Sequence, residues 1–124
     1  MFEVGDVLYV YNTQITPPEC KYSVFVCVRS GLFFLINTKN RNIYNCIPIE
    51  KAKNNYLKYD SFISCNQTFQ YTLSQLKESN KVGRVDFETL KKLYQHINEN
   101  VHTLPTQEKN EILKELNNFI QDYS

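Results

Sequence analysis

Short runs of apolar and aromatic residues alternate with polar turns up to about residue 73. Each run has the length of a β-strand and is rich in Val, Ile, Phe and Tyr, which favour extended backbone. The predicted strands are 7–11, 22–28, 32–38, 43–49 and 59–65, and 69–73 either continues the last strand or pairs with it. Because the connections are too short for a helical crossover, the pattern favours an antiparallel sheet or a small barrel.

The spacing of apolar residues changes near Asp86, which is a good N-cap. From there they recur every three or four residues, as on one face of an amphipathic helix: Phe87, Leu90, Leu93, Tyr94, Ile97 and Val101. A second helix is predicted to begin near Thr103 or Thr106, with Pro105 close to its first turn. Its apolar stripe, which we expect to dock on the strands or on a second subunit, is Ile112, Leu113, Leu116, Phe119, Ile120 and Tyr123.

These patterns predict a single domain over residues 1–124 of the α+β class, mostly β with α. Strands would occupy about residues 1–85 and two C-terminal amphipathic helices about 86–122. An apolar fraction of 42% is enough to form a hydrophobic core.

The charge balance and the N-terminus narrow the class of protein. A net charge of +1 gives no global attraction to nucleic acid or to an anionic membrane, so such binding would need a local patch. No apolar run has the length of a transmembrane helix, and the first residues do not form a signal peptide. We therefore expect a cytoplasmic protein that has no membrane partner.

The residues that most often bind metals do not form a recognisable motif. The chain lacks a C-x-x-C pair, and Cys27, Cys46 and Cys65 each lie in an apolar run, which predicts buried, reduced thiols. The two histidines, His96 and His102, are expected at the surface. The glutamates of the second helix, Glu108, Glu111 and Glu115, alternate with lysines as on a solvated face. We expect no metal and no cofactor.

Several short motifs occur in the order found in one protein family. They are Gly5-Asp6-Val7-Leu8-Tyr9-Val10, the strand 22–28, Asp60-Ser61-Phe62-Ile63, Asn66-Gln67 with Leu76, and Gly83-Arg84-Val85 before a helix. In this order the chain, over about residues 1–98, resembles the PemK/MazF-like toxins. The resemblance implies an SH3-like antiparallel barrel, a homodimer, an antitoxin or other protein partner, and metal-independent cleavage of single-stranded RNA.

The same resemblance suggests which residues would act on RNA. The family usually places an Arg, often followed by Pro, at the start of the second strand, where this chain has Lys21-Tyr22-Ser23. Thr38 matches a Thr or Ser that follows the third strand in the family. Lys21 and Thr38 are therefore the candidate catalytic residues, with Lys21 stabilising charge on the phosphorane and Thr38 contacting the phosphate or the 2′-OH. The alternative interpretation is a solvated loop lysine and a strand-end threonine.

A second group combines basic and aromatic residues, as sites for single-stranded RNA do. The candidate RNA-binding residues are Lys39, Arg41, Tyr44 and Lys58, with Lys51, Lys53, Tyr56 and Tyr59 nearby in the sequence. Solvated turns with half-buried tyrosines would have the same composition. The alternative function, favoured by the missing Arg-Pro, is a non-catalytic SH3-like interaction module that binds a protein partner.

Overall fold

The computed structural model describes residues 2–123, apart from the side chain of Asn42. Its elements, in chain order, are β1 (Asp6–Asn12), β2 (Glu19–Cys27), β3 (Leu32–Asn37), a 3₁₀ turn η1 (Asn42–Tyr44), β4 (Cys46–Ile49), a second 3₁₀ turn η2 (Lys51–Lys53), β5 (Ser61–Phe69), α1 (Leu73–Glu78), β6 (Asn80–Arg84), α2 (Phe87–Asn100) and α3 (Thr106–Asp122). The predicted α+β class is confirmed.

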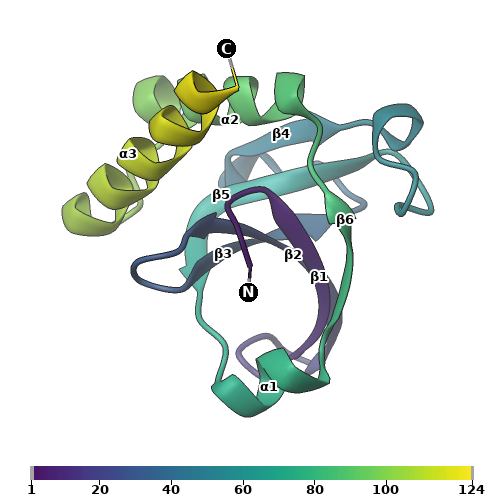
Figure 1. The fold of residues 1–124 in the computed structure, drawn as a ribbon. Helices are drawn as coiled ribbons and strands as arrows, with labels where there is room; N and C mark the ends of the chain where they lie inside the picture. Colours follow the sequence, from purple (N-terminus) through teal and green to yellow (C-terminus); the bar gives the residue numbers. More distant parts are fainter. Residues whose placement is uncertain (1, 124) are drawn as a thin grey trace.

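The strands form one six-stranded sheet in the order β4-β5-β3-β2-β1-β6, and every neighbouring pair is antiparallel (Figure 1). The antiparallel arrangement agrees with the short connections in the sequence. The sheet is not closed, so the predicted barrel is not confirmed.

The predicted strand 43–49 is wrong in its first half. Residues Asn42–Tyr44 form a 3₁₀ turn, in which the amide of Tyr44 donates to the carbonyl of Arg41 at 2.8 Å. Asn45 then has a φ of 50°, in the left-handed region, which interrupts extended backbone. The strand β4 therefore begins only at Cys46.

Two elements were not predicted from the sequence. The short helix α1 begins with a capping box, in which the Thr72 and Gln75 side chains bond each other's backbone amides. The strand β6 pairs with β1 from Asp6↔Arg84 to Tyr9↔Asn80. Both segments are polar and short, so they lack the apolar periodicity on which the predictions were based. The strand β5 continues to Phe69, but residues 70–72 are not in a strand and Leu73 begins α1, so the predicted strand 69–73 is wrong beyond Phe69.

The two C-terminal helices lie together over one side of the sheet, at the top of Figure 1. The side chains of Leu90, Leu93 and Ile97 from α2, and of Ile112 and Leu116 from α3, are fully buried against the strands. The predicted α2 N-cap is confirmed, because the Asp86 carboxylate accepts from the Thr89 amide at 3.1 Å. The second helix begins at Thr106, as the later of the two predicted starts had it.

The opposite face of the sheet carries a smaller apolar cluster. Leu8, Val10, Phe25 and Phe33 are buried there, and Phe2, Tyr71 and Leu76 pack over them. This cluster occupies only one end of that face. The other end is where β2, β3 and β5 carry polar side chains.

The glutamates of α3 do not form a solvated face, so that prediction is wrong. Glu115 accepts from the backbone amides of Val28 at 2.6 Å and Arg29 at 3.1 Å, and Glu111 accepts from the Ser30 hydroxyl. Their carboxylates satisfy the turn between β2 and β3, where backbone groups have no strand partner. Glu108 also bonds to the sheet, as described below.

The thiols match their prediction in part. All four cysteines are free, and Cys27 and Cys65 are fully buried, whereas Cys46 is half-buried. His102 is exposed, as predicted, but His96 is half-buried, with its Nε2 3.1 Å from the backbone oxygen of Asn45.

Candidate functional site

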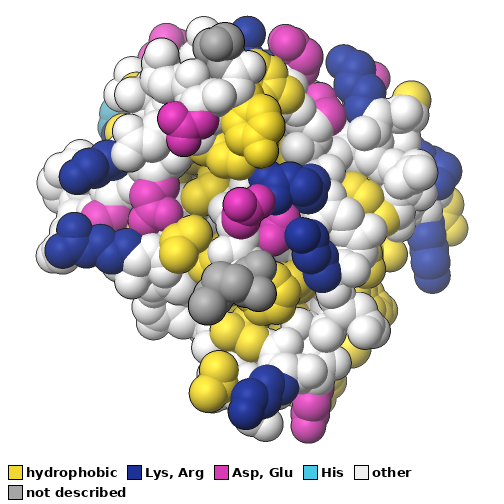
Figure 2. All heavy atoms as spheres, in the orientation of Figure 1, with side chains coloured by type: hydrophobic (Ala, Val, Ile, Leu, Met, Phe, Trp, Pro, Cys, Tyr) yellow, Lys and Arg dark blue, Asp and Glu magenta, His cyan; other side chains and the backbone are white. Residues whose placement is uncertain are grey.

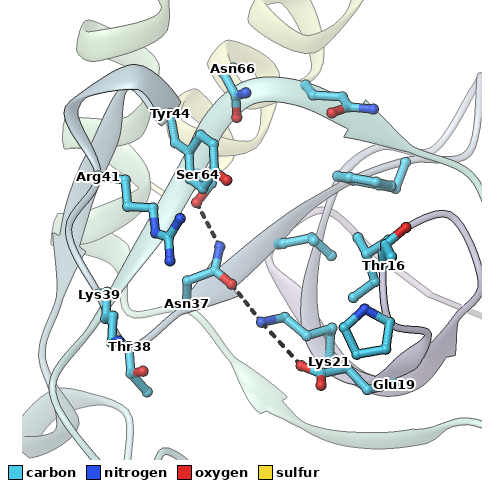
Figure 3. Close-up of a pocket in the computed structure, with 15 residues that line it drawn as sticks. Thr16, Glu19, Lys21, Asn37, Thr38, Lys39, Arg41, Tyr44, Ser64 and Asn66 are labelled. Carbon is cyan, nitrogen blue, oxygen red and sulfur yellow. Dashed lines mark hydrogen bonds and ion pairs between the residues drawn. The ribbon is translucent and has the colours of Figure 1, made fainter.

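A hollow of about 440 Å³ opens on the face of the sheet opposite α2 and α3 (Figure 3). We call it the β3 pocket, because β3 crosses its floor. It is lined by Ile15, Thr16, Pro17, Glu19, Lys21, Leu35, Asn37, Thr38, Lys39, Arg41, Tyr44, Ser64, Asn66, Gln67 and Phe69. Its volume falls in the range of small-ligand sites.

The antiparallel register brings three polar side chains together in this pocket. Tyr22 on β2 pairs with Ile36 on β3, so the preceding Lys21 lies beside the following Asn37 on the other face of the sheet. The Lys21 ammonium donates to Asn37 Oδ1 at 2.5 Å, and Asn37 Nδ2 donates to Ser64 Oγ at 2.8 Å. Figure 3 shows these groups as a line across the pocket floor.

A carboxylate stands at one end of this line. Glu19 Oε1 lies 4.0 Å from Lys21 Nζ, and the Glu19 side chain is 56% exposed while that of Lys21 is 19% exposed. Lys21 is therefore held between an amide oxygen and a carboxylate. Glu19, Asn37 and Ser64 were not among the predicted site residues. The predicted strand began at residue 22, whereas β2 begins at Glu19, and its two-residue alternation places Glu19 on the same face as Lys21.

The side chains at the rim of the pocket differ from those of its floor in exposure and in hydrogen bonding. The side chains of Thr38, Lys39 and Gln67 are exposed, and that of Asn66 is half-buried. Within residues 2–123 these four side chains have no hydrogen bond or ion pair, so their polar groups are free to bind a ligand. Arg41 contacts the ring of Tyr44, with Cζ 5.7 Å from its centroid, and keeps its N–H donors available.

The structure gathers most of the predicted site residues into this one pocket. Lys21, Thr38, Lys39, Arg41 and Tyr44 all line it. In Figure 3 Thr38 lies beside Lys39 at the edge, apart from the line of Lys21, Asn37 and Ser64.

Lys58 is placed elsewhere. It is exposed on the segment between η2 and β5 and does not line the β3 pocket. A substitution of Lys58 can therefore serve as a control for substitutions of the cations that line the pocket.

The charge of the pocket is local. Its lining includes three cations, Lys21, Lys39 and Arg41, and one carboxylate, Glu19. On the face of the molecule shown in Figure 2, acidic and basic side chains are intermixed. With a net charge of only +1 for the chain, an anionic ligand would be attracted by the pocket rim more than by the protein as a whole.

The part of the chain that the structure describes, residues 2–123, holds no group of three or more His, Cys, Asp or Glu side chains that could bind a metal ion. None of its helices combines the length and apolar character needed to cross a membrane. The β3 pocket itself offers lysine, arginine, carboxylate, amide and hydroxyl groups.

Comparison with known proteins adds no family to this description. No family model matches the chain, and no curated protein matches it. The resemblance to the PemK/MazF-like toxins stays a prediction based on the motifs quoted above.

Proposed function

We propose that the β3 pocket binds single-stranded RNA, and that the chain is a toxin-type endoribonuclease or an RNA-binding relative of the PemK/MazF-like toxins. The observation that carries this proposal is the set of unpaired polar groups at one rim. Lys39 and Arg41 can contact phosphates, and Tyr44 offers an aromatic face beside them. Asn66 and Gln67 can donate to and accept from a base edge.

Three side chains that line the pocket could take part in cleavage under this proposal. In metal-independent cleavage the 2′-oxygen attacks phosphorus, the bond from phosphorus to the 5′-oxygen breaks, and a cyclic phosphate forms. Glu19 would accept the proton of the 2′-OH, Lys21 would stabilise the phosphorane and return a proton to the 5′-oxygen, and Thr38 would hydrogen-bond the phosphate. Lys21 supports this role because it is held in place by Asn37.

A binding module without cleavage is the second candidate, and the same hydrogen bond favours it. A lysine that already bonds an amide oxygen and faces a carboxylate has fewer donors left for a phosphorane. It also lacks the planar fork of the family's arginine. In this case a protein partner would occupy the pocket.

The fold and the assembly are part of the proposal. We propose that the open sheet is a variant of the SH3-like barrel, and that the protein is a cytoplasmic homodimer with an antitoxin-type partner. Size-exclusion chromatography with light scattering tests the dimer directly. A monomer at micromolar concentration would count against it.

The test of RNA binding compares two single-cation variants. Arg41→Ala should weaken binding of a labelled mixed-sequence RNA oligonucleotide about tenfold and reduce the slope of log affinity against log salt by about 0.7, the loss of one phosphate contact. Lys58→Ala removes the same charge outside the pocket. Equal losses in the two variants would show that binding is general electrostatic attraction, and no binding by the wild type would overturn the proposal.

A further inference from the structure

The strand β5 contains a large bulge where it forms the wall of the β3 pocket. Leu35 pairs with Ser64, and Phe33 pairs with Phe69. The step from Leu35 to Phe33 covers two residues of β3, whereas the step from Ser64 to Phe69 covers five residues of β5, so β5 has three extra residues there. We call residues 65–68 the β5 bulge. Bulges next to binding sites redirect side chains.

The bulge explains why two consecutive residues line the same pocket. In a regular strand successive side chains point to opposite faces. Asn66 and Gln67 nevertheless both line the β3 pocket. We attribute the presence of both residues in one lining to the irregular shape of the bulge.

Two side chains from the helical part of the molecule hold the bulge. The hydroxyl of Thr103, in the connection between α2 and α3, donates to the backbone oxygen of Asn66 at 2.9 Å. The hydroxyl of Thr68 donates to Oε1 of Glu108, in the first turn of α3, at 2.6 Å. These two hydrogen bonds satisfy the carbonyl of Asn66 and the hydroxyl of Thr68, in the stretch where the pairing between β3 and β5 is interrupted.

We propose that Thr103 and Glu108 are positioning residues of the β3 pocket, which hold the β5 bulge so that Asn66 and Gln67 face the bound ligand. The inference rests on the proposed binding of RNA. Neither Thr103 nor Glu108 lines the pocket, so both act through the bulge.

Because Glu108 is charged, its removal distinguishes an electrostatic effect on RNA affinity from a positioning effect. Removing a carboxylate near a bound polyanion should strengthen binding if only electrostatics matter. If Glu108 supports the pocket wall through Thr68, its removal should weaken RNA binding. The two effects have opposite signs.

The experiment measures RNA affinity, melting temperature and amide hydrogen exchange of residues 65–69. Glu108→Ala should bind the RNA oligonucleotide about tenfold more weakly, as expected for the loss of a hydrogen bond to a charged group. Glu108→Gln should keep most of the affinity, because its amide oxygen still accepts from Thr68. Thr103→Val should also weaken binding, and both weakened variants should exchange faster over 65–69.

The control is Glu99→Ala, which removes an exposed carboxylate of α2. It should change neither affinity nor exchange at 65–69. Wild-type exchange in Glu108→Ala, or affinity equal to or above that of the wild type, would overturn the inference. Absence of RNA binding by the wild type would overturn the proposed function and the ligand named here, while hydrogen exchange would still decide whether these residues hold the bulge.

Discussion

The Lys21 ammonium donates a 2.5 Å hydrogen bond to the carboxamide oxygen of Asn37, across the pair of strands β2 and β3. This contact fixes a positive charge at the floor of the β3 pocket. Arg41 and Lys39, by contrast, are exposed at the rim. The pocket therefore contains one cation held at a fixed point of its floor, Lys21, and two exposed cations at its rim that are suited to bind phosphate.

Gly83→Ala should destabilise the protein because of a close approach to Tyr56. A Cβ at position 83 would lie 2.4 Å from Cδ1 and 2.7 Å from Cε1 of the Tyr56 ring. That ring has little room to move, since its hydroxyl donates to Asn54 Oδ1 at 3.1 Å and the ring packs against Tyr22 and the main core cluster. The expected loss is about 1–3 kcal/mol of unfolding free energy, measured by urea denaturation.

Gly31→Ala is the matched comparison for this prediction. Gly31 has a φ of 65°, but a Cβ there would meet nothing within 4 Å. It should therefore lose only the strain of the left-handed backbone, about 1 kcal/mol. Tyr56→Leu should relieve part of the Gly83→Ala defect, and fully additive effects would contradict the steric explanation.

Leu116→Asp tests whether α3 belongs to the core. Leu116 is fully buried in the main cluster, so the variant loses apolar packing and buries a carboxylate. We expect a loss of at least about 3 kcal/mol, read from the melting curve. Asn117→Asp adds the same charge at the exposed neighbouring position and should be nearly neutral. An unchanged melting temperature in Leu116→Asp would show that α3 is not needed for the fold.

The elements that could be predicted well from the sequence are those in which apolar residues recur at regular spacing. The stripe from Phe87 to Ile97 repeats at helical spacing, and the structure buries its Leu90, Leu93 and Ile97. The short helix α1 and the strand β6 have no such signal, because their segments are polar and tertiary contacts hold them in place. β6, for example, is tied to β1 by Arg84, whose Nη1 lies 2.6 Å from the buried carboxylate of Asp6.

The candidate site was predictable only where a residue carries charge or matches a motif. Lys21 and Arg41 stand out in a sequence, whereas Asn37 and Ser64 are ordinary polar residues whose roles depend on strand register. Register is set by the turns and the core together and cannot be read from one strand. The same limit applies to Glu108, whose partner, Thr68, is forty residues away in the sequence.

Thiol reactivity should divide the four cysteines and give stability a pH dependence. Burial, together with the hydrogen bond to Glu115, raises the pKa of Cys27 from 9.0 to about 11, and burial also raises the pKa of Cys65. The folded state therefore keeps these protons at a pH where the unfolded state loses them. The contribution of these two thiols to stability should be constant below about pH 9, and it should make stability fall as the pH rises from 9 toward 11.

Two measurements check this prediction. Denaturant midpoints should be nearly equal at pH 8 and 9 and lower at pH 10, and Cys27→Ala should flatten the decrease. A thiol reagent at pH 8 should modify the exposed Cys20 rapidly and Cys27 and Cys65 only on unfolding. Rapid modification of all four thiols in the native protein would contradict the buried placement.

Cleavage of RNA is the prediction that separates an endoribonuclease from a protein that only binds RNA or a protein partner. If the β3 pocket is catalytic, Lys21→Ala and Thr38→Ala should each reduce cleavage of a mixed RNA substrate by about 100- to 1,000-fold in the absence of metal, as the loss of one preorganised donor does. Lys21→Arg should keep or raise the rate, because it restores the planar fork. Electrophoresis with identification of a 2′,3′-cyclic phosphate product measures both the rate and the mechanism.

The control for the cleavage assay is a variant that keeps the pocket intact. Lys58→Ala removes an exposed lysine outside the pocket and should cleave as the wild type does. Equal cleavage by the wild type and both alanine variants would point to a contaminating nuclease, because the held ammonium of Lys21 cannot be dispensable in this mechanism. RNA binding by the wild type without any cleavage would instead favour the RNA-binding relative over the endoribonuclease, since the bond to Asn37 and the nearby Glu19 would then leave Lys21 too engaged to stabilise a phosphorane. Neither binding nor cleavage of RNA would favour the module that binds a protein partner.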